Sequence, residues 1–277
     1  MLKENYHIAV PTSFSQNEEL EVDNTINHVQ NLYEQGIKSV LVCGTTGEQH
    51  SLTVAEKIEL IEALDDHDVT KNMEILFGVS AVRQKDAVIL AKAIRKSNIA
   101  GIMLGFPPYI VPTQDEMITY TTKVIEAGQK PTILYNNPPR TGFDLAEETM
   151  ITLFNNVDLI IGVKEAGQKS NDSLAHIKKS CPGIFLYAGG EVNLESKLKS
   201  GFNRLSSILG NVDPEGIREW FNRLQLGEED QLKDQKVTHL LQSLFTDCSV
   251  IIHIKEALNK QGTQIGICRS PLGIKKP

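Results

Sequence analysis

A lysine follows one of the most apolar segments of the chain. Lys164 comes directly after residues 159–163 (LIIGV), a continuous apolar run typical of a strand buried on both faces. Burial would disfavour the ammonium form and lower the pKa of this lysine. A partly neutral amine at a carbonyl-sized cavity is the group that forms Schiff bases with ketones. Lys164 is therefore the candidate nucleophile, and the alternative is a rim lysine paired with Glu165 or Glu191.

A phenol and a guanidinium lie close together in residues 133–142 (ILYNNPPRTG). Tyr135 ends the strand expected beside that of Lys164, so its hydroxyl could carry protons to and from a bound substrate. Arg140 lies in a loop stiffened by proline and could bind a carboxylate through two parallel hydrogen bonds. The alternatives are simple packing for the tyrosine and a surface salt bridge for the arginine.

The turn 44–48 (GTTGE) combines two glycines with two hydroxyls and several backbone amides. Glycine permits a tight turn, and such a group of donors can hold a small carboxylate without a metal. No lysine follows the second glycine, so the turn is not a P-loop. A capped strand-to-helix turn is the structural alternative.

Short apolar segments alternate with longer amphipathic segments along the chain, as in βα units on a parallel sheet. Helical periodicity is clear in 53–64, 85–97 and 115–127, and helix starts are expected at Thr53 (with Glu56 in a capping box), Thr113, Ser170 and Asp213. Eight strands are expected, at 7–11, 39–43, 74–79, 101–105, 132–136, 159–164, 184–189 and 204–209.

Eight such units predict an α/β fold, a (β/α)8 TIM barrel, with a doubly wound open sheet as the alternative. Residues 1–227 would form the catalytic barrel, and 228–277 a C-terminal helical region with helices at 231–245 and 249–260. Catalytic groups of such barrels lie where strands end and βα loops begin. Lys164, Tyr135 and the turn 44–48 all occupy such positions.

Composition narrows the possible partners. The 277 residues carry a net charge of −7 with scattered Lys and Arg, so no nucleic acid is expected as a partner. The first ten residues (MLKENYHIAV) lack the apolar core of a signal peptide, and no apolar run approaches the roughly 20 residues of a spanning helix. We expect a cytoplasmic protein without a membrane partner. Its four cysteines are far apart, which indicates neither disulfides nor a zinc site.

Five segments, taken in order, resemble one known family over nearly the whole chain. They are AVPTSF (9–14), GTTGE (44–48) followed by SLT (51–53), YNNPPRTG (135–142), GVKEA (162–166) and IKEALNKQG with RSPL (254–262 and 269–272). The chain is thereby identified as similar to the dihydrodipicolinate synthase / N-acetylneuraminate lyase family of class I aldolases. This resemblance implies a (β/α)8 barrel with a C-terminal helical appendage, a homodimer or homotetramer, and small-molecule substrates. It implies no metal and no organic cofactor.

The same resemblance assigns roles to individual residues. Lys164 would hold pyruvate as an imine, and Tyr135 would be the proton-relay tyrosine. Thr45 would link it to a second tyrosine, matched by Tyr109, which comes from the neighbouring subunit. Arg140, in a P-x-R-T-G pattern, implies an aldehyde that carries its own carboxylate and favours the synthase branch, in which pyruvate condenses with L-aspartate 4-semialdehyde for lysine and diaminopimelate biosynthesis. The expected substrate-binding residues are Thr46, Gly47, Arg140, Gly189 and Ser206.

Three departures from the family pattern leave the aldehyde open. Residues 106–109 (FPPY) replace Thr-Pro-Tyr-Tyr, residues 189–191 (GGE) replace Gly-Asp-Asp, and the sequence stops soon after RSPL, where many relatives continue. An aldolase for 2-keto-3-deoxy sugar acids or N-acetylneuraminate is the runner-up, and a non-catalytic binding barrel is a further alternative. A sugar-phosphate isomerase is less well supported, because the eighth strand lacks a glycine-rich phosphate turn.

Regulation can also be addressed from the resemblance. Many bacterial members are inhibited by lysine, which binds at the tight dimer interface. The matching positions here combine apolar side chains, an added positive charge and a proline in place of an aromatic residue. This combination predicts an enzyme insensitive to lysine. The positions are Gln49, His50, Val54, Lys57, Val82 and Pro108.

Overall fold

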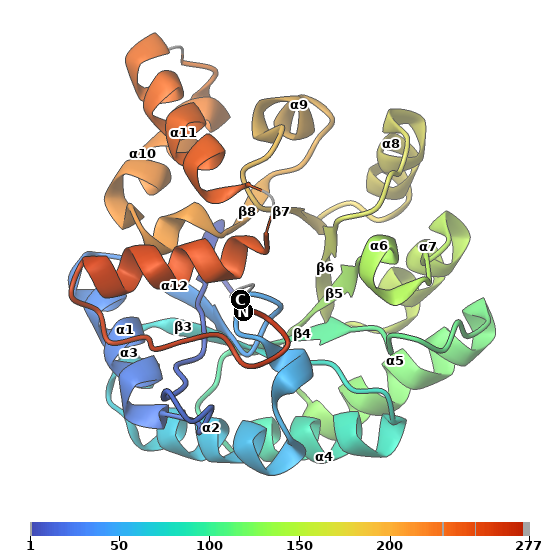
Figure 1. Cartoon of the computed structure of the whole chain (residues 1–277). Helices are drawn as coiled ribbons and strands as arrows, with labels where there is room; N and C mark the ends of the chain where they lie inside the picture. The colour runs from blue at the N-terminus through green and yellow to red at the C-terminus, as the bar shows by residue number, and fades with distance from the viewer. Residues whose placement is uncertain (1, 229, 247, 274–277) are drawn as a thin grey trace.

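Eight parallel strands close into a barrel in the computed structural model of the protein (Figure 1). The structure describes residues 2–228, 230–246 and 248–273. Each strand pairs with the next, and β1 pairs with β8, which completes the closure. The predicted TIM barrel is confirmed and the open sheet is excluded. The strands are β1 (Tyr6–Ala9), β2 (Ser39–Val42), β3 (Glu74–Val79), β4 (Gly101–Gly105), β5 (Thr132–Asn136), β6 (Ile160–Glu165), β7 (Phe185–Gly189) and β8 (Arg204–Ser207).

Helices cover the outside of the barrel (Figure 1). The expected capping boxes of Thr53 and Thr113 are both present, and the side chains of Ser170 and Asp213 cap their helices. The helices are α1 (Val22–Glu34), α2 (Val54–Asp66), α3 (Val69–Asn72), α4 (Gln84–Arg95), α5 (Gln114–Gly128), α6 (Pro138–Thr141), α7 (Glu147–Asn156), α8 (Asn171–Ser180), α9 (Leu194–Lys199), α10 (Pro214–Leu226), α11 (Gln231–Leu244) and α12 (Val250–Lys260), with short 3₁₀ turns η1 (Gln49–Ser51) and η2 (Leu209–Asn211).

Two layers of apolar side chains result from the alternation of side chains along each strand. The inner layer fills the barrel and includes Leu41, Leu76, Met103, Ile133 and Tyr187. The outer and larger layer packs the strands against the helices. Because the interior is filled, the open space for a ligand lies at the ends of the strands rather than along the barrel axis.

The C-terminal region packs against the first βα units. The two predicted helices are present as α11 and α12, and the segment after α12 runs beside the first two βα units (Figure 1, red). Phe14 and Gly266 form an isolated β-bridge between them. The division into a barrel and a separate helical region at 227/228 stays a prediction. Among the described residues, no helix is long and apolar enough to cross a membrane, and the cytoplasmic location also stays a prediction.

Candidate active site

Lys164 lies inside the barrel near the carboxyl end of β6. Only 6% of the residue is exposed, and its Nζ donates a hydrogen bond to Ser206 Oγ at 3.0 Å. Its neighbour across the sheet is Tyr135, whose ring centroid lies 4.6 Å from the Nζ. Burial lowers the pKa of Lys164, while Tyr135 and Glu191 oppose this shift. The side chain is therefore enclosed and biased towards the neutral amine, as the sequence predicts.

The alternative of a lysine paired with a neighbouring glutamate is not what the structure shows. The carboxylate of Glu165 accepts hydrogen bonds from Asn136 Nδ2 (2.8 Å) and from the backbone of Gly167. Glu191 accepts from the Ser207 hydroxyl and from backbone amides of η2 and its N-cap. Burial raises the pKa of both carboxyl groups. Neither forms an ion pair with Lys164 in the described part of the chain.

Tyr135 is held by two polar side chains. Asn137 Nδ2 donates to its hydroxyl at 2.6 Å, and a hydrogen bond joins the hydroxyl to Thr45. Burial acts to raise the pKa of Tyr135, but the charge of Lys164, these hydrogen bonds and Arg140 together leave it below the ordinary value. A phenol with a lowered pKa beside an amine is suited to proton transfer. Asn137 was not predicted, although its place two residues after Tyr135 was the available signal.

The turn 44–48 is tightly packed at the end of β2. Glu48 N donates to Thr45 O at 3.0 Å, and the Thr12 hydroxyl donates to Gly47 O at 2.7 Å. A Cβ at Gly47 would lie 3.1 Å from Val10 O and from a second backbone atom, so the position favours glycine. The neighbouring Thr46 is only 5% exposed. The turn therefore has the fixed geometry that carboxylate binding by amides requires.

A pocket opens over this end of the barrel. Its walls bring together Thr45 from the turn after β2, Tyr135 from β5, Asn137 from the loop that follows, and Arg140 from the short helix α6. Lys164 does not itself line the pocket, but its Nζ lies over the ring of Tyr135, which does. Arg140 is exposed, and its positive charge contributes to the lowered pKa values of Tyr135 and Lys164. The predicted phenol, hydroxyl and guanidinium thus share one cavity.

Gly189 and Ser206 are also next to the lysine. A Cβ at Gly189 would lie 3.2 Å from Lys164 Cε, so the absence of a side chain leaves room for the lysine. Tyr109 is the exception among the predicted residues. It is 92% exposed, has φ of +77°, and is not among the residues that line the pocket, although the preceding Pro108 is.

A buried histidine was missed by the sequence reasoning. His7 is 1% exposed, and its ring lies 5.5 Å from that of Tyr187 in the barrel interior. Burial, with the charges of Lys164 and Arg204, places the pKa of His7 well below its usual range. Burial therefore favours the neutral form of the imidazole. A polar residue within the apolar run 7–11 was the signal.

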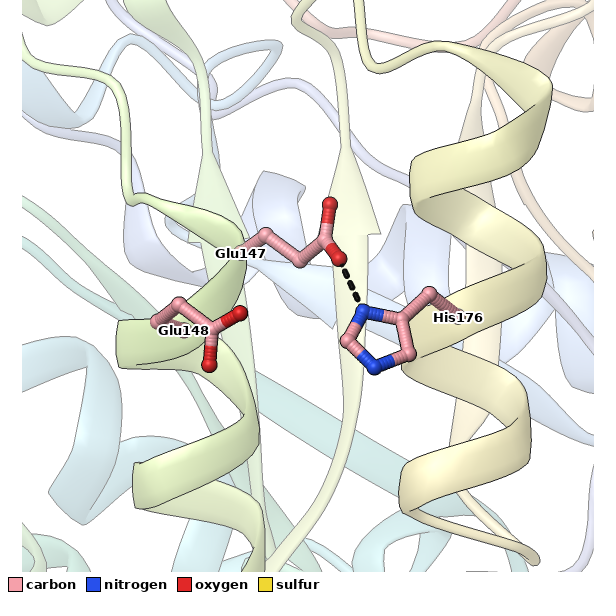
Figure 2. A group of neighbouring side chains, drawn as sticks. All are labelled: Glu147, Glu148 and His176. Carbon is pink, nitrogen blue, oxygen red and sulfur yellow. Dashed lines mark hydrogen bonds and ion pairs between the residues drawn. The ribbon is translucent and has the colours of Figure 1, made fainter.

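One further cluster of ionisable groups lies on the surface between α7 and α8 (Figure 2). Ligand atoms of Glu147, Glu148 and His176 lie within 4.8 Å of one another, the one such group in the described residues. His176 Nδ1 already contacts Glu147, and two of the three residues are exposed. The cluster has the character of an ordinary surface ion pair, and we assign it no function.

The fold and the buried lysine at the end of β6 have the architecture of class I aldolase barrels. The family model described as the dihydrodipicolinate synthetase family matches residues 3–276. The chain belongs to this family, which confirms the resemblance found in the sequence and the expectation of an enzyme of the synthase and lyase type.

Relatives and solved structures agree with this assignment. The 4-hydroxy-tetrahydrodipicolinate synthase of Lachnoclostridium phytofermentans is 28% identical over 268 residues, which cover 96% of this chain and 90% of that protein. A dihydrodipicolinate synthase structure from Bacillus anthracis is 25% identical with a TM-score of 0.87, covering 98% and 93% of the two chains. The structure of the synthase from Cyanidioschyzon merolae with lysine bound shares the fold, with 24% identity, a TM-score of 0.86 and coverage of 98% and 93%.

Proposed function

We propose that the chain is a pyruvate-dependent synthase that condenses pyruvate with L-aspartate 4-semialdehyde to form 4-hydroxy-tetrahydrodipicolinate. The observation that carries the proposal is Lys164, an enclosed amine with a lowered pKa directly beside the phenol of Tyr135. An unpaired lysine so deep in a barrel is costly unless the neutral amine is used. The names of two relatives, both 4-hydroxy-tetrahydrodipicolinate synthases, support the same reaction.

The chemistry proceeds through a covalent intermediate. The neutral amine of Lys164 attacks the ketone carbon of pyruvate, and loss of water from the carbinolamine leaves an imine. Tyr135 supplies and removes the protons of these steps, with Thr45 hydrogen-bonded to it. The imine loses a proton from its methyl group to give an enamine, whose carbon attacks the aldehyde. The amino group of the aldehyde substrate then attacks the imine carbon, which closes the ring and releases the amine of Lys164. The lysine serves as the electron sink throughout.

Two different groups would bind the two carboxylates. Residues 44–48 present the Thr45 and Thr46 hydroxyls and backbone amides on the pyruvate side, including the amide of Gly47. Arg140, on the wall of the pocket, would bind the carboxylate of the aldehyde. Gly189 and Ser206 would leave space for the substrate carbon chain beside the lysine.

We also propose that the active form is a homodimer or homotetramer. Tyr109, Ile110 and Val111 are 92%, 56% and 65% exposed and make an apolar edge beside the pocket, with Val82 at 53%. A tyrosine that is exposed in one chain and held in a left-handed backbone is suited to reach a second copy. Tyr109 would then complete the proton relay through Thr45 of its partner.

The first test is to trap the imine. Pyruvate with borohydride should reduce the adduct onto Lys164, and peptide mass mapping should locate it there, whereas Lys164→Ala should take up no label. Absence of labelling in the native protein would refute the aldolase chemistry and favour a binding barrel. Coupled assays with aspartate semialdehyde, compared with cleavage of 2-keto-3-deoxygluconate and of N-acetylneuraminate, would then identify the aldehyde partner.

A further inference from the structure

Glu48 closes the turn 44–48, yet its carboxylate contacts the C-terminal segment and not the pocket. The residue is 0% exposed. Its Oε2 accepts a hydrogen bond from the backbone N–H of Arg269 at 2.9 Å, and its Oε1 lies 2.6 Å from Lys255 Nζ. The two residues of this ion pair are 207 positions apart in the sequence. A fully buried charge pair between such distant segments is a costly arrangement that needs a structural or functional reason.

The backbone of Glu48 fixes the shape of the turn. Its φ of +51° is left-handed, which is uncommon for a residue other than glycine. Its N–H donates to Thr45 O at 3.0 Å, and its carbonyl accepts from Ser51 N (2.8 Å) and Ser51 Oγ (2.9 Å). Any rotation at Glu48 would therefore move Thr45, which is hydrogen-bonded to the phenol of Tyr135.

The two residues that hold the Glu48 carboxylate, Lys255 by its ammonium and Arg269 by its backbone N–H, are themselves fixed. Lys255, on α12, is 2% exposed and also donates to Ile267 O at 2.6 Å. The Arg269 side chain donates to Glu18 O at 2.7 Å and to Ser51 O at 2.9 Å. Arg269 thus binds the N-terminal segment and η1 at once. The C-terminal segment meets the turn through rigid, hydrogen-bonded groups.

We propose that Glu48, Lys255 and Arg269 are positioning residues that hold the Thr45 hydroxyl against Tyr135. Contacts then run without a break from Lys255 to Glu48, along the turn to Thr45, and on to Tyr135 and Lys164. The effect of these residues on catalysis rests on the proposed function. Their effect on the contact between Thr45 and Tyr135 can be measured without substrate. The segments IKEALNKQG and RSPL thereby gain a role in the site, because they contain Lys255 and Arg269.

Removing one charge of the Glu48–Lys255 ion pair should disturb the turn more than removing both. Glu48→Gln leaves the ammonium of Lys255 buried without a counter-charge, and Lys255→Met leaves the carboxylate in the same state. In the double variant Glu48→Gln/Lys255→Met, neither charge remains. The single variants should therefore displace the turn, and the double variant should restore its position. Asp234→Asn is a matched control, since it breaks a contact with Arg223 between α11 and α10, far from the turn in the sequence.

The experiment titrates the Tyr135 phenol by ultraviolet difference spectroscopy, with Tyr135→Phe in each background as the reference. We expect the pKa of Tyr135 to rise in both single variants, because the hydrogen bond from Thr45 stabilises the phenolate. It should return in the double variant and stay unchanged in Asp234→Asn. Arg269→Lys keeps the charge but loses the forked contacts, and it should give a smaller shift in the same direction if the single variants do not fold.

A kinetic readout distinguishes this proposal from the proposed function. Trapping of pyruvate by borohydride should slow about 10- to 100-fold in the single variants, the range expected for a small misplacement of catalytic groups. If Glu48→Gln melts at a lower temperature yet keeps the wild-type titration of Tyr135, the positioning role is refuted. If the wild-type protein traps no pyruvate, the proposed function fails, and the titration still decides the positioning role.

Discussion

At the scale of single residues, the groups around Lys164 set the pKa of its amine. Burial lowers the pKa of Lys164, and Tyr135 and Glu191 only partly oppose this shift. Amine reactivity at neutral pH depends on the fraction that is deprotonated. The hydrogen-bonded Glu191 therefore has a long-range effect on Lys164 although the two do not pair.

Replacing Glu191 by glutamine should shift the pH dependence of imine formation. A carboxylate at this position raises the pKa of Lys164, so its neutral analogue should lower that pKa, and the deprotonated amine should persist to lower pH. The acid limb of the borohydride-trapping rate should accordingly move to lower pH. Glu195→Gln on α9 removes one charge from a surface position and should leave the profile unchanged. An unmoved profile in Glu191→Gln would mean that Glu191 is already protonated in the enzyme.

Arg140→Ala should separate the two half-reactions. Arg140 is exposed in the free protein, so solvent weakens its ionic contribution, and we expect a loss of about 1.4–2.7 kcal/mol, or 10- to 100-fold in kcat/KM for the acidic aldehyde. Trapping of pyruvate should change little, because Arg140 would not touch the first substrate. Equal losses in trapping and in turnover would place Arg140 on pyruvate or in a structural role.

Local sequence patterns determine some elements better than others. Strands β3, β4 and β5 begin and end where the apolar runs predict. The eighth strand was predicted to reach residue 209 but ends at Ser207, because Glu191 binds the backbone N–H groups of Ile208 and Leu209 and η2 forms there. A side chain from another βα unit causes this end, so no local pattern could have shown it.

The residues of the site likewise divide into those that local sequence patterns predict and those that depend on distant parts of the chain. The positions of Lys164, Tyr135 and the turn 44–48 at one end of the barrel could be predicted, because strand ends can be read from sequence position. The role of Thr45 came only from the family resemblance, and all three catalytic roles stay predictions. The contact between Glu48 and Lys255 could not be predicted, because it joins residues brought together only by the docking of α12. Arg140 lies between these cases: the proline-rich segment was expected to be a loop, and Pro138 in fact begins the short helix α6.

A matched pair of glycine substitutions tests the docking of the C-terminal segment. Gly262 and Gly266 both have positive φ, so alanine costs about 1 kcal/mol at either position. A Cβ at Gly266 would also lie 1.8 Å from Phe14 O, whereas Gly262 has nothing within 4 Å. Gly266→Ala should lower the free energy of unfolding by about 2 kcal/mol or more beyond Gly262→Ala, measured by urea denaturation. Equal losses would show that the segment does not pack closely on Phe14.

At the scale of the whole molecule, the proposed dimer would join the pocket to the exposed apolar edge formed by Tyr109, Ile110 and Val111. The pocket includes Pro108, while Tyr109 and Ile110, the next two residues, are exposed. A second copy that covers this edge would bury apolar surface and lie next to two active sites at once. The proposed dimer therefore makes the residues of the interface part of the environment of catalysis, and an effector bound there could act on the site.

Lysine should not act as that effector. Lys57 is 5% exposed, and its Nζ donates to Gln49 Oε1 (3.1 Å) and Ser80 O (3.2 Å), so two groups that could bind a cationic ligand are already used. Val82 is exposed and apolar, and Pro108 offers no aromatic face. For a bound lysine, charge repulsion and desolvation should each cost about 1 kcal/mol or more. A millimolar site provides only roughly 4 kcal/mol of binding free energy, so these costs would weaken binding well beyond the millimolar range.

Titration of L-lysine to several millimolar in a turnover assay, with D-lysine as a control for ionic strength, should therefore leave the rate unchanged. The same additions should leave the melting temperature unchanged, because a ligand that binds the folded state would raise it. Saturating inhibition by the L-isomer alone would show that an effector site exists despite Lys57, and that the interface places other polar groups around it.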